Sequence, residues 1–338
     1  MTRLSFLLFL TGLLMLIGVN GMAQDIDKGP FRDTRPDTWV AMDDLGRTVP
    51  GFDECGAPRD RIVGIFYFLW QEDIPNTKVH DITKLLAADA DNPDWGPPGA
   101  FHWWSQPHMG YYIMDDEFVI RKHAQMLVDA GVDAIFFDVT NAVTYDHNFL
   151  TICKVFREMR EAGQATPQIS FLLNSGAQNV ARHLYNNFYA KNLYPELWFK
   201  WLGKPLILAS DEGLDDELKN YFTLRQSWAW TDPNGWFGNG KDKWPWLDNC
   251  PQNYGWHEPG VPEHVSVTVA QHSTSNIGRS FQNGRQPAPE DQQSDIGLCF
   301  TEQWERALEI DPEFVFITGW NEWIAQRFLS DGNAYMLG

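Results

Sequence analysis

The sequence predicts an α/β fold of the (β/α)8 TIM-type barrel class, with long tryptophan-rich loops after its strands. From residue 61 onward, apolar strand-like runs alternate with amphipathic helical segments, which is the pattern of parallel strands covered by helices. The runs are apolar along most of their length, which indicates strands buried on both faces. No dinucleotide-type glycine fingerprint follows the first run, and this favours a barrel over a doubly wound sheet.

Seven strand-like runs follow one another along the chain. The first, residues 61–70, precedes a long segment, 71–115, that is rich in aromatic residues. A loop of this length is usually functional or disordered, and its many rings argue against disorder. The later runs are 132–139, 168–174, 205–210, 224–230, 265–271 and 313–318.

Helices are predicted between these runs. Asp115 opens the first helix and Gly131 ends it, while Asp146 opens the second and Gly163 ends it. An eighth strand is not visible: either a loop hides it or the chain, which stops at Gly338, is truncated. The other predicted helices are 177–189, 214–222 and 295–309.

The N-terminus has the pattern of an export signal. Arg3 precedes a leucine-rich apolar run, and a small-x-small cleavage site ends at Ala23. We therefore expect residues 1–23 to be a signal peptide, 24–60 an N-terminal arm and 61–338 the catalytic domain. The expected location is periplasmic or extracellular, without a stable membrane span after cleavage. An uncleaved anchor is the alternative, although the run is short for a full span.

Charge and cysteine content exclude several classes of partner. A formal net charge of -19 argues against nucleic acid and anionic membrane surfaces. Four cysteines are too few and too scattered for a disulfide scaffold or a zinc cluster, so we expect no metal and no other cofactor. Cys153 lies on the apolar face of a predicted helix, which indicates a core position. The sequence leaves open the oligomeric state and the disulfide state of Cys55, Cys250 and Cys299.

Tryptophan is the most unusual feature of the composition. Many of the 16 Trp residues fall in loops rich in Pro and Gly, where core packing does not explain them. Indoles in loops suit flat ligands with C–H faces, above all sugar rings, although they also serve to pack long loops down.

Two carboxylates stand where barrel strands should end. The segment Trp320-Asn321-Glu322-Trp323 directly follows the last apolar run, and Asp138 ends the second. In a barrel the carboxyl ends of the strands share one face, so we predict Glu322 and Asp138 to be a catalytic pair. Paired carboxylates are what glycosidic cleavage needs. The alternatives are helix capping or a salt bridge at the barrel mouth.

Other side chains near the predicted strand ends suit sugar binding, because amides hold hydroxyl groups and indoles stack on rings. The histidines lack HxH or HExxH spacing, so we interpret them as hydrogen-bonding groups and not as metal ligands. His123, on a helix face, is expected to be a core residue. The predicted substrate-binding residues are Trp70, His102, Trp103, Trp104, His108, Tyr112, Asn141, Asn174, Trp228, Trp230, His272, Arg279, Trp320, Asn321 and Trp323.

The segment Gly319 to Trp323, together with the order of strands and helices, resembles the retaining endo-α-mannosidases of glycoside hydrolase family 99 and the related family 71 and WbsX-like proteins. The resemblance implies a sugar-active barrel and a catalytic role for Glu322. In the family 99 pattern a second catalytic glutamate follows three positions later, and Ala325 stands there in this sequence. The departure means that the resemblance carries over neither the mannosidase substrate nor that mechanism.

The sequence therefore predicts an exported glycoside hydrolase that acts on a poly- or oligosaccharide through paired carboxylates. The alternatives are a glycan-binding barrel without catalytic activity, since Ala325 removes one acid of the family pair, and a metal-dependent hydrolase, which requires His102, His108 or His272 to converge within ligand distance. The sugar, the linkage, endo or exo action and the stereochemical outcome are not predicted.

Overall fold

The computed structural model describes residues 41–44, 46–48, 60–71, 78–232, 235–269, 281–291, 293, 295–330 and 333–337. The predicted signal peptide, most of the predicted arm, Cys55, His272 and Arg279 lie outside these residues. Within the described part, no helix is long and apolar enough to cross a membrane.

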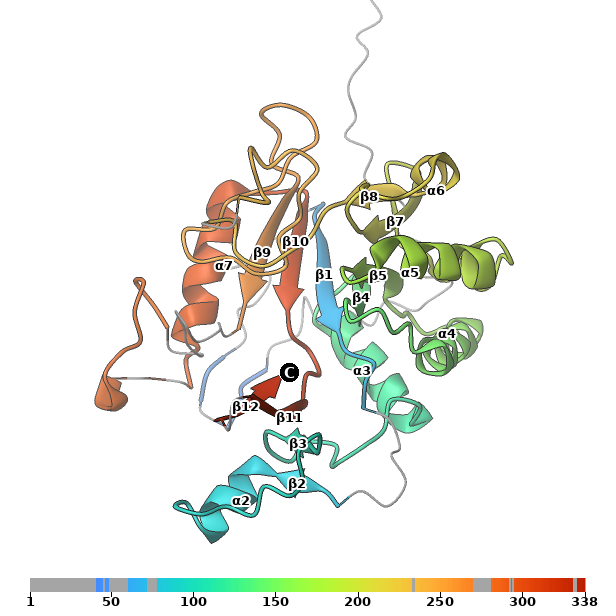
Figure 1. Cartoon of the computed structure of the whole chain (residues 1–338). Coiled ribbons are helices and arrows are strands. Elements are labelled where there is room, and N and C mark those ends of the chain that lie inside the picture. Colours follow the sequence, from blue (N-terminus) through green and yellow to red (C-terminus); the bar gives the residue numbers. More distant parts are fainter. Residues whose placement is uncertain are drawn as a thin grey trace, which may run out of the picture.

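A sheet of seven parallel strands forms the body of the protein (Figure 1). The last of these strands pairs with the first, with Phe314 opposite Ile62, while Ala134 of the second stands opposite Gly64. A short strand, β6 (Lys200–Trp201), adds in antiparallel fashion beside β7. The parallel strands, in spatial order, are β8 (Thr223–Arg225), β7 (Lys204–Leu208), β5 (Gln168–Leu173), β4 (Ala134–Val139), β1 (Ile62–Tyr67), β10 (Phe314–Thr318) and β9 (His264–Thr268).

The sheet is curled, as ring contacts between distant strands show. Trp201 of β6 stands at one end of the sheet order, yet its ring lies 6.0 Å from that of Phe314 in β10 near the other end. Within the described residues, the aromatic and aliphatic side chains that fill the concave side come from strands and loops and from no helix. This inner core includes Phe66, Phe136, Leu172, Leu208, Phe314, Phe316 and Trp244.

The prediction of eight barrel strands is not met within the described residues, where β8 and β9 do not pair directly. Irregular backbone spans the gap between β8 and β9, which we call the seam. There Trp244 N donates to Gln226 O at 2.8 Å, and Gly255 N donates to His264 O at 2.8 Å. The spanning segment contains Pro245 and Pro251, which have no N–H to donate to a ladder. The missing strand is therefore replaced by loop.

Trp244 also corrects the interpretation of loop tryptophans. It is fully buried in the inner core, stacks on Phe314 with ring centroids 4.5 Å apart, and donates its Nε1–H to Glu263 at 2.8 Å. Glu263 in turn accepts two hydrogen bonds from Arg225. Core packing thus accounts for this loop indole, and sugar binding does not.

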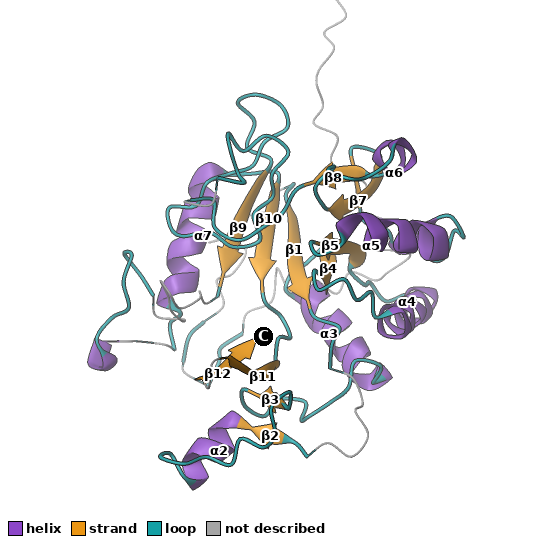
Figure 2. Ribbon diagram, in the orientation of Figure 1, coloured by secondary structure: helices purple, strands orange, loops and turns teal. Residues whose placement is uncertain are grey.

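Helices cover the convex face of the sheet (Figure 2). Their apolar faces form an outer core with the opposite side chains of the strands, and His123 and Cys153 are buried there as predicted. The helices are α3 (Glu117–Asp129), α4 (Asp146–Glu161), α5 (Ala177–Leu184), α6 (Asp216–Tyr221) and α7 (Leu298–Ile310), with shorter turns η2 (Tyr185–Tyr189), η3 (Pro195–Leu197) and η4 (Pro289–Asp291). Cys153, Cys250 and Cys299 are free thiols.

A second, four-stranded sheet lies beyond the carboxyl ends of β1, β9 and β10 (Figure 1). Its order is β12-β11-β3-β2, and a short helix, α2 (Ile82–Ala88), follows β2. The sheet brings the segment after β1 against the end of the chain. Its strands are β2 (His80–Asp81), β3 (Phe101–Trp103), β11 (Ile324–Ser330) and β12 (Asn333–Leu337).

Candidate active site

Two carboxylates interact at the carboxyl ends of the central strands. Asp138 is the fifth residue of β4, and Glu322 follows β10 by four positions. Both side chains are half-buried. Burial, together with the charge of Asp138, raises the pKa of Glu322 to about 8. The two side chains predicted as a catalytic pair are therefore close enough to influence each other's ionisation.

Glu322 and Asp138 differ in protonation state at neutral pH. Burial raises the pKa of Asp138, but the backbone N–H of Thr140 donates to its Oδ1 at 2.9 Å and favours the ionised form. Asp138 therefore ionises first, and its charge then disfavours ionisation of Glu322. At neutral pH Glu322 holds a proton, which a carboxylic acid with a pKa of about 8 can donate to a leaving group.

Asn321 hydrogen-bonds the segment Trp320-Asn321-Glu322-Trp323, called the motif below, to the end of β1. Its Oδ1 accepts from Phe68 N at 2.8 Å, and its Nδ2 donates to Phe68 O at 2.9 Å. Its own carbonyl accepts from Gln71 Nε2 at 2.8 Å. The side chain is fully buried and both of its polar atoms are bonded, so Asn321 positions Glu322 and leaves no free polar atom for the sugar contact predicted from sequence.

Trp320 and Trp323, the indoles near Glu322 in the chain, contact His123 and Tyr112 respectively. The ring of His123 meets Trp320 edge to face at 5.6 Å, and Tyr67 Oη lies 2.8 Å from His123 Nδ1. Trp323 Nε1 donates to Tyr112 Oη at 2.9 Å. Burial lowers the pKa of His123 to about 4 and raises that of Tyr112, so both groups are neutral at physiological pH.

Two of the histidines predicted to bind substrate, His102 and His108, lie within the described residues, and their surroundings differ. His102 is fully buried in β3, where its ring nitrogens lie 2.9 Å from Trp95 O and 3.0 Å from Ala100 O, so it braces the loop that precedes β3. His108 is exposed, and Trp104 has 45% of its surface exposed. Among the described residues, no group of three or more His, Cys, Asp or Glu side chains could hold a metal ion.

The other residues predicted to bind substrate follow the strand ends and differ in how far they are exposed. Asn141 is exposed and donates to Tyr145 Oη at 2.7 Å, while Asn174 is exposed directly after β5. Trp228 has 37% of its surface exposed beyond β8, and Trp230 is half-buried two residues later. These side chains follow the carboxyl ends of β4, β5 and β8.

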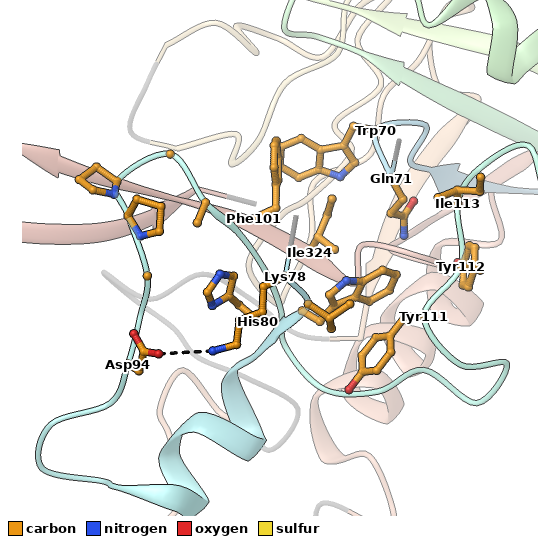
Figure 3. A pocket seen from close by; sticks show the side chains of 17 residues that line it. Trp70, Gln71, Lys78, His80, Asp94, Phe101, Tyr111, Tyr112, Ile113 and Ile324 are labelled. Carbon is orange, nitrogen blue, oxygen red and sulfur yellow. Dashed lines mark hydrogen bonds and ion pairs between the residues drawn. The ribbon is translucent and has the colours of Figure 1, made fainter. Parts of the chain in front are cut away.

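A recess of about 810 Å³ opens next to the motif, between the end of β1 and the small sheet (Figure 3). The predicted ligands Trp70, Trp103 and Tyr112 line it. Sequence reasoning missed Gln71 and Tyr111, which line it as well. The position of Gln71 directly after an apolar run was a usable signal, whereas nothing local marked Tyr111.

Ala325 stands where the family 99 pattern has its second glutamate. It is fully buried in β11, where it stands opposite His102 of β3. The carboxylate whose charge acts on Glu322 is Asp138, which comes from a different strand.

No family model and no curated protein matches the chain. Among solved structures it is similar to the GH99 endo-alpha-mannosidase from Bacteroides thetaiotaomicron in complex with BIS-TRIS-propane, at 13% identity and a TM-score of 0.46, covering 78% of this chain and 84% of that one. Another structure of the GH99 endo-alpha-mannosidase from that organism aligns at 13% identity and a TM-score of 0.44, covering 77% and 85%. These values are too low to transfer an activity, so the roles proposed below rest on this chain's own residues.

Proposed function

We propose that the protein is a glycoside hydrolase in which Glu322 is the general acid and Asp138 is its ionised partner. The observation that carries the proposal is the electrostatic interaction of two strand-end carboxylates, one of which has a pKa of about 8. Glycosidases need one protonated and one ionised carboxyl group at the same pH.

The chemistry follows from the two protonation states. Glu322 gives its proton to the glycosidic oxygen as the bond between that oxygen and the anomeric carbon breaks. Asp138 either bonds to the anomeric carbon or takes a proton from the water that attacks it. In the first case one water then attacks the anomeric carbon, the bond to Asp138 breaks, and Glu322 recovers its proton from that water. In both cases the net reaction is addition of water across one glycosidic bond.

A glycan-binding protein without activity is the second candidate, and the buried Ala325 favours it, because the acid of the family pattern is absent. The two candidates differ in whether the pair of Glu322 and Asp138 turns over substrate. We also propose that the protein is exported, which rests on the signal-like pattern of residues 1–23. N-terminal sequencing of the secreted protein tests that proposal, with cleavage after Ala23 as the expected result.

The activity test is a screen of the purified protein against polysaccharides and aryl glycosides, with reducing-sugar release as the readout. Glu322→Gln is assayed in parallel, with Glu309→Gln, an exposed change on α7, as the matched control. Release by the wild type and the control but not by Glu322→Gln supports the proposal. Glycan binding with no release on any substrate supports the binding protein instead.

A further inference from the structure

The recess beside the motif is a separate space from the acidic pair, since neither Glu322 nor Asp138 lines it. Five Trp, Phe and Tyr residues line it, and they come from the end of β1, from β3 and from the loop before α3 (Figure 3). Its volume of about 810 Å³ is in the range of sites that bury small organic ligands. The aromatic lining residues are Trp70, Phe101, Trp103, Tyr111 and Tyr112.

Two polar atoms on its wall have no hydrogen-bond partner within the described part of the chain. Gln71 is only 2% exposed; its Nε2 donates to Asn321 O, but its Oε1 is unpaired. The neighbouring Trp70 has a buried, unpaired Nε1–H. Buried polar groups without partners are rare in proteins, because leaving them unpaired opposes folding. One acceptor and one donor on consecutive residues of the wall match a hydroxyl group, which can donate to the first and accept from the second.

The charges around the recess cancel. Lys78 and Asp94 both line it and form an ion pair of 3.3 Å with each other. Burial lowers the pKa of His80, the other basic group on the wall, so its ring is neutral at physiological pH. The described lining residues therefore offer no unpaired charge to a ligand with a net charge.

We propose that this recess is a subsite for pyranose rings of a neutral glycan, held by ring stacking and by a hydroxyl group between Gln71 Oε1 and Trp70 Nε1. The recess is joined to the motif, because Gln71 bonds to Asn321 and Tyr112 bonds to Trp323. Its occupant is the part of the substrate that extends beyond the cleaved bond. In that respect the inference rests on the proposed function, and it predicts a preference for oligosaccharides over aryl monosaccharides.

The test is calorimetric titration of neutral oligosaccharides of glucose, mannose, xylose and N-acetylglucosamine, with oligogalacturonate as the anionic comparison. The titrations use the Glu322→Gln protein, so that binding is not followed by cleavage. Trp70→Phe keeps an aromatic ring and removes the unpaired donor together with the smaller ring of the indole. We expect about 5- to 30-fold weaker binding of the neutral glycan, with no loss of thermal stability.

Two further variants keep the test decisive. Val79→Trp, at an exposed position on the rim, fills the recess without touching the core and should abolish binding. Trp304→Phe, on α7, lies outside the recess and should leave the affinity unchanged. The inference would be overturned if Trp70→Phe and Val79→Trp bound the neutral glycan as tightly as the Glu322→Gln protein without these changes. A preference for oligogalacturonate, or no binding of any neutral glycan, would overturn it as well.

The outcomes separate this inference from the proposed function. Glycan binding that depends on Trp70, in a wild-type protein that releases no reducing sugar, would support the subsite and refute the hydrolase. Hydrolysis of an oligosaccharide with an unchanged KM in Trp70→Phe would support the hydrolase and refute the subsite.

Discussion

Replacing Glu322 with Gln should raise the stability of the protein while it removes activity. The carboxyl group of Glu322 has a pKa of about 8 in the folded protein against an ordinary value of 4.5. Below pH 4.5 it is protonated in both the folded and the unfolded state, so it does not affect their balance. Between pH 4.5 and 8 the unfolded chain ionises while the folded protein does not, so stability falls as the pH rises.

The size of the effect follows from the width of that interval. Each pH unit costs about 1.4 kcal/mol, so the wild type loses about 3 kcal/mol at most by pH 7. Glu322→Gln does not ionise and escapes this loss. We therefore expect the Tm of the variant to exceed that of the wild type by several degrees at pH 7 and to equal it near pH 4.

Differential scanning calorimetry at a series of pH values measures this difference. Glu217→Gln is the control, because Arg182 holds the pKa of Glu217 below its ordinary value and the change should bring no gain at pH 7. Turnover of Glu322→Gln should fall by about a hundredfold to ten thousandfold. A variant with no gain in Tm at pH 7 would contradict the raised pKa of Glu322, and one with wild-type turnover would contradict its role as the proton donor.

Three further predictions concern the same face. Wild-type turnover should decline above about pH 8, as Glu322 loses its proton, and a pH–rate profile that stays flat to pH 10 would contradict this. Asn321→Ala leaves Phe68 N and O unpaired, so urea denaturation should show a loss of roughly 2–4 kcal/mol; a loss below about 0.5 kcal/mol would contradict the fastening role. Tyr67→Phe removes the partner of the buried His123 Nδ1 and should cost about 1–3 kcal/mol. Tyr185→Phe removes a hydroxyl group whose hydrogen bond to Glu217 is exposed, and it should have little effect; equal losses in the two variants would refute the inference that the Tyr67–His123 hydrogen bond supports Trp320.

The sequence predicted the parallel strands well because each is an apolar run that has to be buried on both faces. It also predicted the meeting of Glu322 and Asp138, because the carboxyl ends of parallel strands share one face of the sheet. Neither prediction required knowledge of a partner residue. The strand boundaries were the weaker part: the predicted strand 224–230 ends at Arg225.

The small sheet could not be predicted, because its pairing is non-local and its strands are short. Ala325 stands opposite His102, more than two hundred positions away in the chain, and no local pattern marks either residue as part of a ladder. For the same reason His102 and Asn321 were expected to contact sugar. Both use their polar atoms on backbone groups that only the folded chain brings near.

Trp244 illustrates a different limit. A tryptophan between Lys243 and Pro245, in a segment of loop composition, gives no sign that it fills the inner core. It does so because the seam between β8 and β9 contains loop in place of a strand, and a large side chain from that loop occupies the space. Composition alone does not distinguish such an indole from one that binds a ligand.

The measurement that most directly tests the acid–carboxylate assignment is a pH titration of the Glu322 carboxyl carbon by ¹³C NMR, in the wild type and in Asp138→Asn. We predict a pKa of about 8 in the wild type, and a lower value in Asp138→Asn because the neighbouring negative charge is gone. A wild-type pKa near 4.5 would contradict the assignment of Glu322 as the proton donor.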